Sequence, residues 1–132
     1  MTRVEIFEGV RDCLMQVTDI ADPARIREDT EIIGGLGADS LDLLALTFQL
    51  EQRFKVKISP RDIERRARQR LGAVPLEVDG VYTPEAIAVL REALPEIPPE
   101  ELREGLTVAQ LPRLFRVATM VTLVSRLLEE RT

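Results

Sequence analysis

The stretch GGLGADSLD, which spans Gly34 to Asp42, decides how the rest of the chain is arranged. Its glycines allow positive φ angles and close approach to neighbouring segments. Asp39 is a residue type that commonly caps the start of a helix, and apolar residues follow it at helical spacing. The sequence therefore predicts a glycine-rich loop that opens into a helix, with Ser40 at the first helical position.

This predicted helix runs from about Ser40 to Phe54, and most of its surface is apolar. Two adjoining stripes carry its apolar side chains: Leu41, Leu44 and Phe48 on one, and Leu43, Leu46, Leu50 and Phe54 on the other. Free backbone N–H groups and the positive end of the helix dipole lie at the start of such a helix. That position favours a phosphate attached to the Ser40 side chain.

The run LGADSLD, from Leu36 to Asp42, resembles the phosphopantetheine attachment site of the acyl carrier protein family. The resemblance implies that Ser40 takes a covalent 4′-phosphopantetheine arm from coenzyme A, with Asp39 and Leu41 beside the arm. The chain has no histidine to activate the hydroxyl, so we expect a separate phosphopantetheinyl transferase to do that chemistry. We expect no catalytic residues and no metal site, and hence no enzyme.

The composition is that of a globular protein: 132 residues, 45% apolar and 31% charged. A net charge of −5 argues against nucleic acid as a partner. No run approaches the roughly 18 apolar residues that span a bilayer, and no secretory leader is visible. Cys13 has no disulfide or metal partner, which suggests a core thiol in a reducing compartment. We therefore expect a monomeric cytoplasmic protein with no membrane span and a single carrier domain over residues 1–132.

Start and stop signals elsewhere in the chain predict further helices. Thr2 to Glu5 has the spacing of a capping box, so a first helix is expected over about residues 3–17, followed by a long loop anchored by Ile20 and Ile26. A last helix is expected from a second capping box at Thr107 to about Glu130, with a kink or a late start at Pro112.

Between the second and the last helix lies an Arg-rich helix and then a Pro-rich acidic stretch. The Arg-rich helix is expected to start at Ser59-Pro60 and stop at Gly72, and another to start at Thr83 and end before Pro95. Because their charges are opposite, we expect the Arg-rich helix and the acidic stretch to attract each other. Residues from about 59 to 105 are longer than the corresponding region of the family.

The resemblance implies an all-α fold, an acyl-carrier-like four-helix bundle with additional helices inserted between the second and last core helices. Residues 1–58 follow the family's plan, and Leu106-Thr107-Val108 resembles the segment that opens its last helix. Partner enzymes are expected to bind the helix that begins at Ser40, through the residues Asp42, Leu44, Phe48 and Glu51. Core packing is an equally good interpretation of Leu44 and Phe48. Ala45 and Gln52 stand where carboxylates are common in the family. Partners that bind through Arg and Lys contacts would therefore bind this helix more weakly.

The resemblance therefore implies that this protein is an acyl carrier. It would hold an acyl chain as a thioester and present it to enzymes of fatty-acid, lipid or polyketide-type synthesis. One alternative is an aminoacyl or peptidyl carrier with the same arm. A second alternative is an unmodified helical interaction module, in which Ser40 only caps its helix.

Overall fold

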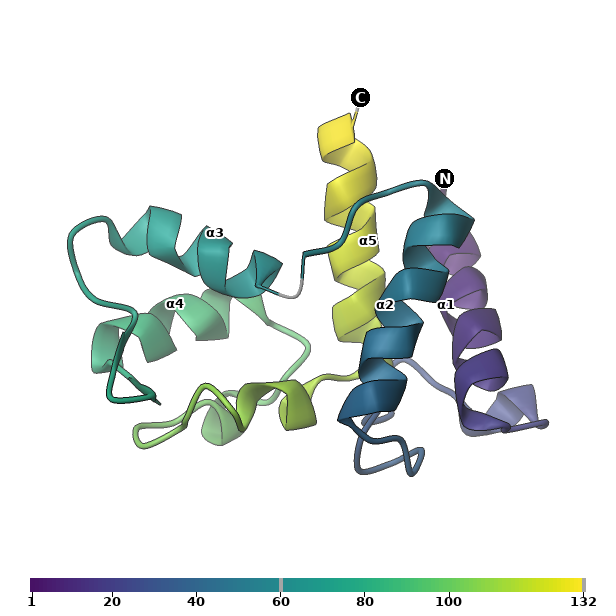
Figure 1. Cartoon of the computed structure of the whole chain (residues 1–132), viewed down its shortest axis with the longest axis horizontal. Helices are drawn as coiled ribbons and strands as arrows, with labels where there is room; N and C mark the ends of the chain where they lie inside the picture. Colours follow the sequence, from purple (N-terminus) through teal and green to yellow (C-terminus); the bar gives the residue numbers. More distant parts are fainter. Residues whose placement is uncertain (60, 132) are drawn as a thin grey trace. The chain divides into compact units, whose positions relative to one another are not determined.

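The computed structural model describes residues 1–59 and 61–131 and divides into two compact units (Figure 1). Unit 1 comprises Met1–Ile58 together with the chain from Phe115 onward, and unit 2 comprises Ser59–Leu114. Helices dominate both units, so the predicted all-α fold, with helices added between the second and the last, is confirmed. That the two units act as a single carrier domain stays a prediction.

Unit 1 is built from α1 (Arg3–Thr18), α2 (Ser40–Phe54) and α5 (Val117–Arg131). In Figure 1, α1 (purple), α2 (blue) and α5 (yellow) lie side by side, and α2 and α5 both begin at the lower end of the view. Their apolar side chains share one core, which includes Ile6, Val10, Leu14, Leu46, Leu50, Val117, Val121 and Val124. The predicted bounds of the first two helices are confirmed.

Local hydrogen bonds explain where α1 starts, and two buried isoleucines hold the loop that follows it. The Thr2 hydroxyl accepts the N–H of Glu5, and the Glu5 carboxylate accepts the N–H of Thr2, each at 3.2 Å. This is the predicted capping box. In the loop, Ile20 and Ile26 are buried as predicted, and a short 3-10 turn, η1 (Pro23–Arg25), lies between them.

The contact between α1 and α2 depends on a glycine. A Cβ atom at Gly9 would lie 2.5 Å from Cζ of Phe54 and 2.9 Å from Nε of Arg53. Next to this crossing, Arg53 of α2 pairs with Asp12 of α1 at 3.3 Å. The missing side chain at Gly9 therefore sets how closely the two helices approach.

The last helix starts late, which was one of the two outcomes predicted at Pro112, but the predicted start at the Thr107 capping box was wrong. The reciprocal bonds between Thr107 and Gln110 do form, at 3.0 and 3.2 Å, but they close only a turn, which a 3-10 helix follows, η3 (Leu111–Leu114). Pro112 has no N–H to continue an α-helix. Helix α5 begins at Val117, where the N–H of Arg116 donates to Oγ1 of Thr119 at 3.0 Å. The segment that opens the last helix is thus Phe115 to Val117, not Leu106-Thr107-Val108.

Unit 2 consists of α3 (Asp62–Leu71) packed against α4 (Pro84–Ala93), with a hairpin between them and a 3-10 turn, η2 (Pro99–Glu101), after α4. Its apolar core includes Leu76, Tyr82, Leu90, Ile97 and Leu102. Arg70 of α3 pairs with Glu92 of α4, an instance of the predicted attraction between basic and acidic segments. The expected insertion at 59–105 corresponds to a unit that extends to Leu114.

The ends of these helices follow the predicted signals, with one change at α3. Gly72 caps α3 at a φ of 62°, and the Thr83 hydroxyl accepts the N–H of Ala86 at the start of α4. Pro60, predicted as the first helical residue, lies outside the described residues. Helix α3 begins at Asp62, whose buried carboxylate accepts the N–H of Ser59 and the guanidinium of Arg65, both at 2.7 Å.

The hairpin pairs β1 (Glu77–Val78) with β2 (Val81–Tyr82) in antiparallel register. Its turn places Asp79 at a φ of 52° and Gly80 at 80°. Asp-Gly between two valines is the usual sequence of such a two-residue turn, so the hairpin was readable from the sequence.

Candidate functional site

Ser40 is the first residue of α2, and its side chain is exposed. The start of the helix is held by two reciprocal bonds. The Asp39 carboxylate accepts the N–H of Asp42 at 2.8 Å, and the Asp42 carboxylate accepts the N–H of Asp39 at 3.1 Å. Asp39 has the predicted capping role, and Asp42 completes a capping box that the sequence reasoning missed.

Two backbone N–H groups at the start of α2 are available to bind an anion. Within residues 1–59 and 61–131, the backbone N–H groups of Ser40 and Leu41 have no acceptor. Such groups, together with the helix dipole, favour a phosphate at this end of a helix. The residues therefore fit a phosphate on Oγ of Ser40.

Two glycines of the run before α2 need to be glycine, for different reasons. Gly37 has a φ of 72°, a conformation unfavourable for other residues. A Cβ atom at Gly35 would lie 2.6 Å from the carbonyl oxygen of Glu31. Leu36, between the two glycines, and Ala38, just after them, are buried, so the loop is anchored in the core while Ser40 stays exposed.

The exposed face of α2 next to Ser40 is apolar. Leu41 is 74% exposed, Leu44 42% and Phe48 56%, whereas Leu46 and Leu50 are fully buried. Of the two interpretations left open for Leu44 and Phe48, core packing is excluded. Exposed large apolar side chains that form a continuous helix face are typical of a protein-binding surface.

The carboxylates of α2 hold the backbone of this region. Oε2 of Glu51 accepts the N–H of Ile58 at 2.8 Å and so fixes the chain where it leaves α2. Asp42 is already used in the capping box. Ala45 and Gln52, on the same side as Leu41 and Phe48, are exposed and uncharged. The surface beside Ser40 therefore offers apolar contact, and its nearest carboxylates also bind their own backbone.

The chain has recognisable relatives. The family described as phosphopantetheine attachment site matches residues 8–68, a range that contains Ser40 and all of α2. The acyl carrier protein of Campylobacter hominis is 39% identical over 62 residues, which are 47% of this chain and 77% of that protein. The chain belongs to the acyl carrier protein family. The acyl carrier protein of Thermotoga maritima is 36% identical over 64 residues, 48% of this chain and 78% of that protein. No solved structure gives a significant match.

Membership of the acyl carrier protein family defines the chemistry of the molecule in general terms. Acyl carrier proteins are carriers and not catalysts, and their cofactor is covalently attached 4′-phosphopantetheine. Their partners are phosphopantetheinyl transferases and synthase enzymes. In the part of the chain that the structure describes, no helix is long and apolar enough to cross a membrane, and no group of side chains has the composition of a metal site.

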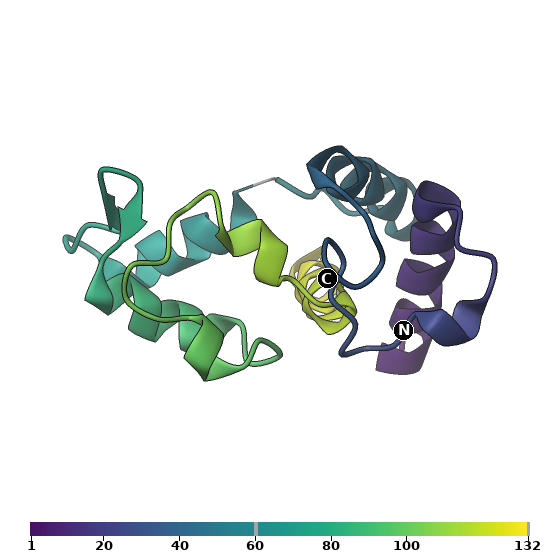
Figure 2. The same ribbon diagram turned by 90° about the horizontal axis from the view of Figure 1, so that it is seen from below.

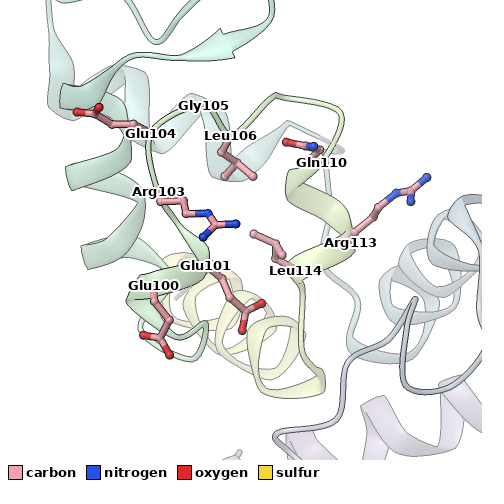
Figure 3. Close-up of a pocket in the computed structure, with 9 residues that line it drawn as sticks. All are labelled: Glu100, Glu101, Arg103, Glu104, Gly105, Leu106, Gln110, Arg113 and Leu114. Atoms are coloured by element: carbon pink, nitrogen blue, oxygen red, sulfur yellow. The ribbon is translucent and has the colours of Figure 1, made fainter.

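Unit 2 of this acyl carrier protein has an open pocket of about 670 Å³ (Figure 3). Figure 3 shows Arg103 pointing towards Leu114, whereas Glu104 and Arg113 point away from the centre. The lining mixes acidic, basic and apolar side chains: Glu100, Glu101, Arg103, Glu104, Gly105, Leu106, Gln110, Arg113 and Leu114. Charges of both signs therefore surround the pocket.

Proposed function

We propose that Ser40 holds the 4′-phosphopantetheine arm and that the protein presents an acyl group to enzymes of fatty-acid, lipid or polyketide-type synthesis. The supporting observation is an exposed hydroxyl at the start of a capped helix, beside two N–H groups without acceptors among the described residues. The LGADSLD run and the family match over residues 8–68 include the same serine. When bound, the arm supplies a thiol that holds the acyl group as a thioester.

The chain's own residues position the arm and do no chemistry on it. The Asp39–Asp42 capping box keeps the start of α2 rigid, and the N–H groups of Ser40 and Leu41 are placed to bind the phosphate. With no histidine in the sequence, the transferase has to supply the base that removes the Ser40 proton.

Partner enzymes are proposed to bind the exposed face of α2. Leu44 and Phe48 supply apolar contact area, and Leu41 lies between them and the arm. Asp42 and Glu51 add negative charge to the same region while they hold the backbone. Because most of this contact is apolar, we expect binding to depend only weakly on salt concentration.

The attachment site is tested by incubating the purified chain with coenzyme A and a broad-specificity phosphopantetheinyl transferase, and measuring its intact mass. We expect one arm per chain, and none in Ser40→Ala. Ser59→Ala is the matched control, because Ser59 is also an exposed serine close to the start of a helix, and this variant should be modified normally. A mass gain that survives Ser40→Ala would contradict the site, and no gain in the wild type would favour the unmodified interaction module.

The cargo is tested separately, by isolating the protein from its native cells and identifying the thioester by mass. We expect an acyl chain; an aminoacyl or peptidyl group would contradict this part of the proposal. The proposal also includes a monomeric carrier in the cytoplasm, a compartment in which the buried free thiol of Cys13 stays reduced.

A further inference from the structure

Arg116 is a buried arginine just before α5, and its partner lies in the loop before α2. The residue is only 7% exposed. Its guanidinium donates to Oε1 of Glu31 at 3.2 Å. A buried arginine needs such a partner, because an unpaired charge in the interior is strongly unfavourable.

Backbone hydrogen bonds reinforce this contact on both sides. Ile32 donates its N–H to the carbonyl of Phe115 at 3.2 Å, Val117 donates to Thr30 at 3.0 Å, and Ala118 donates to Glu28 at 2.8 Å. Figure 2 shows the blue loop that leads to α2 passing beside the yellow start of α5. The start of α5 and the loop over residues 28–32 therefore form one fixed segment.

Glu31 continues this fixed segment into the glycine run. Its carbonyl accepts the N–H of Gly35 at 3.0 Å. A Cβ atom at Gly34 would lie 2.8 Å from Oε2 of the same residue. The side chain of Glu31 thus binds Arg116 while its backbone closes the turn that leads, through buried Leu36 and Ala38, to Ser40.

From this geometry we infer that Glu31 and Arg116 are a positioning pair for Ser40. A loop with three glycines has many accessible conformations, and ordering it costs conformational entropy. The pair, joined to the turn at Gly35, restricts that freedom four residues before the capping box of α2. Ser40 is thereby presented in one position to the transferase. The inference rests on the proposed attachment at Ser40.

The test compares kcat and KM of arm transfer for the wild type, Glu31→Gln and Arg116→Met. The apolar face of α2 is not changed by these substitutions, so KM should stay within about twofold of the wild type. A misplaced hydroxyl should lower kcat by about tenfold, since small displacements of a reacting group have effects of that size or larger. Arg116→Lys, which keeps the charge, should recover part of the loss.

A matched control comes from the other arginine–glutamate pair on this loop. Arg3 pairs with Glu28 at 3.1 Å and donates to Oγ1 of Thr122 at 3.2 Å, but both side chains of the pair are about half exposed. Arg3→Met should therefore leave kcat unchanged. Glu31→Gln keeps the test informative if Arg116→Met does not fold, because the Glu31 side chain is 43% exposed.

The outcomes separate this inference from the proposed function. If the wild type is not modified at Ser40, the proposed function fails. If the wild type is modified and Glu31→Gln has the same kcat, the positioning pair is refuted. It is equally refuted if the loss in kcat only equals the fraction of unfolded protein measured by thermal unfolding.

Discussion

Two residues of α2, two positions apart, have opposite surroundings. Leu46 is fully buried in the core of unit 1, whereas Phe48 is 56% exposed beside the proposed attachment site. Their contributions to stability and to partner binding should differ accordingly. An exposed side chain that only packs against a partner adds little to the stability of the free protein.

We expect Phe48→Ser to change the free energy of unfolding by no more than about 0.5 kcal/mol and to raise the KM of arm transfer several-fold. Leu46→Ala is the contrasting variant and should lose about 2–5 kcal/mol of stability, because it leaves a cavity. Denaturant unfolding and transferase kinetics measure the two effects. An unchanged KM in Phe48→Ser would show that the transferase does not contact this face.

The sequence predicted the apolar stripes of α2 but not which of them is exposed. Helical periodicity is a property of α2 alone, while burial depends on where α1 and α5 pack, and those contacts are long-range. The roles of Asp42 and Glu51 were missed for a similar reason: their bonds to backbone N–H groups depend on the conformation of the chain on either side of the helix.

At the scale of elements, the packing of α1 on α2 is controlled by Gly9. An alanine there would be more favourable for an isolated helix by about 1 kcal/mol. In the folded protein, however, its Cβ would meet the Phe54 ring at 2.5 Å, so the ring or the helix has to shift. Overpacking of this kind costs about 1–3 kcal/mol and outweighs the gain in helix propensity.

We therefore expect Gly9→Ala to be destabilised by about 1 kcal/mol and Gly9→Val by about 3 kcal/mol. Thermal or urea unfolding measures both. Glu8→Ala is the control, since Glu8 is exposed on the same helix and should change stability by less than about 0.5 kcal/mol. A more stable Gly9→Ala would mean that α2 moves away from α1 at little cost.

The helix starts that the sequence predicted correctly depend on short-range chemistry. Thr2, Asp39 and Thr83 each bond an N–H three residues on, within the same turn. The same chemistry is present at Thr107, yet a helix does not follow, because Pro112 comes too early for the next turn to close. A capping box therefore predicts a turn, and the residues after it decide whether the turn becomes a helix.

At the scale of the whole molecule, each of the two units contains one residue that can report its unfolding. The sequence contains one cysteine, one tyrosine and no tryptophan. Cys13 is buried in unit 1, and Tyr82 is buried in unit 2, where its hydroxyl donates to Glu64 at 3.3 Å. Burial raises the pKa of the Cys13 thiol, which slows its reaction with thiol reagents in the folded state.

We expect Tyr82 fluorescence to report unfolding at a lower urea concentration than labelling of Cys13 does. Unit 2 is the shorter of the two, and short chains bury a smaller fraction of their surface. Tyr82→Phe should abolish the fluorescence transition and leave the transition measured by Cys13 labelling in place. Coincident transitions would contradict separate unfolding and would support the prediction of a single carrier domain.

The division into two units could be predicted from the sequence only in part. Opposite charge indicated that α3 and the acidic segment attract, but the packing of α3 and α4 into a unit with its own apolar core depends on tertiary contacts that no local pattern specifies. The sequence did place the boundary near Ser59, because the family's pattern ends there. It placed the other boundary near residue 105, since the turn at Thr107 resembled a helix start.

The late position of α5 also affects how the protein folds as it is synthesised. Helix α1 ends at Thr18, and its partner α5 begins only at Val117, after all of unit 2. Pairings between residues so far apart form slowly, because a long loop must close first. On the ribosome, unit 2 is complete before the last helix of unit 1 emerges, so unit 2 can fold first. The faces of α1 and α2 that pack on α5 then stay uncovered until α5 has emerged, and it is during this interval that the nascent chain is most exposed to aggregation.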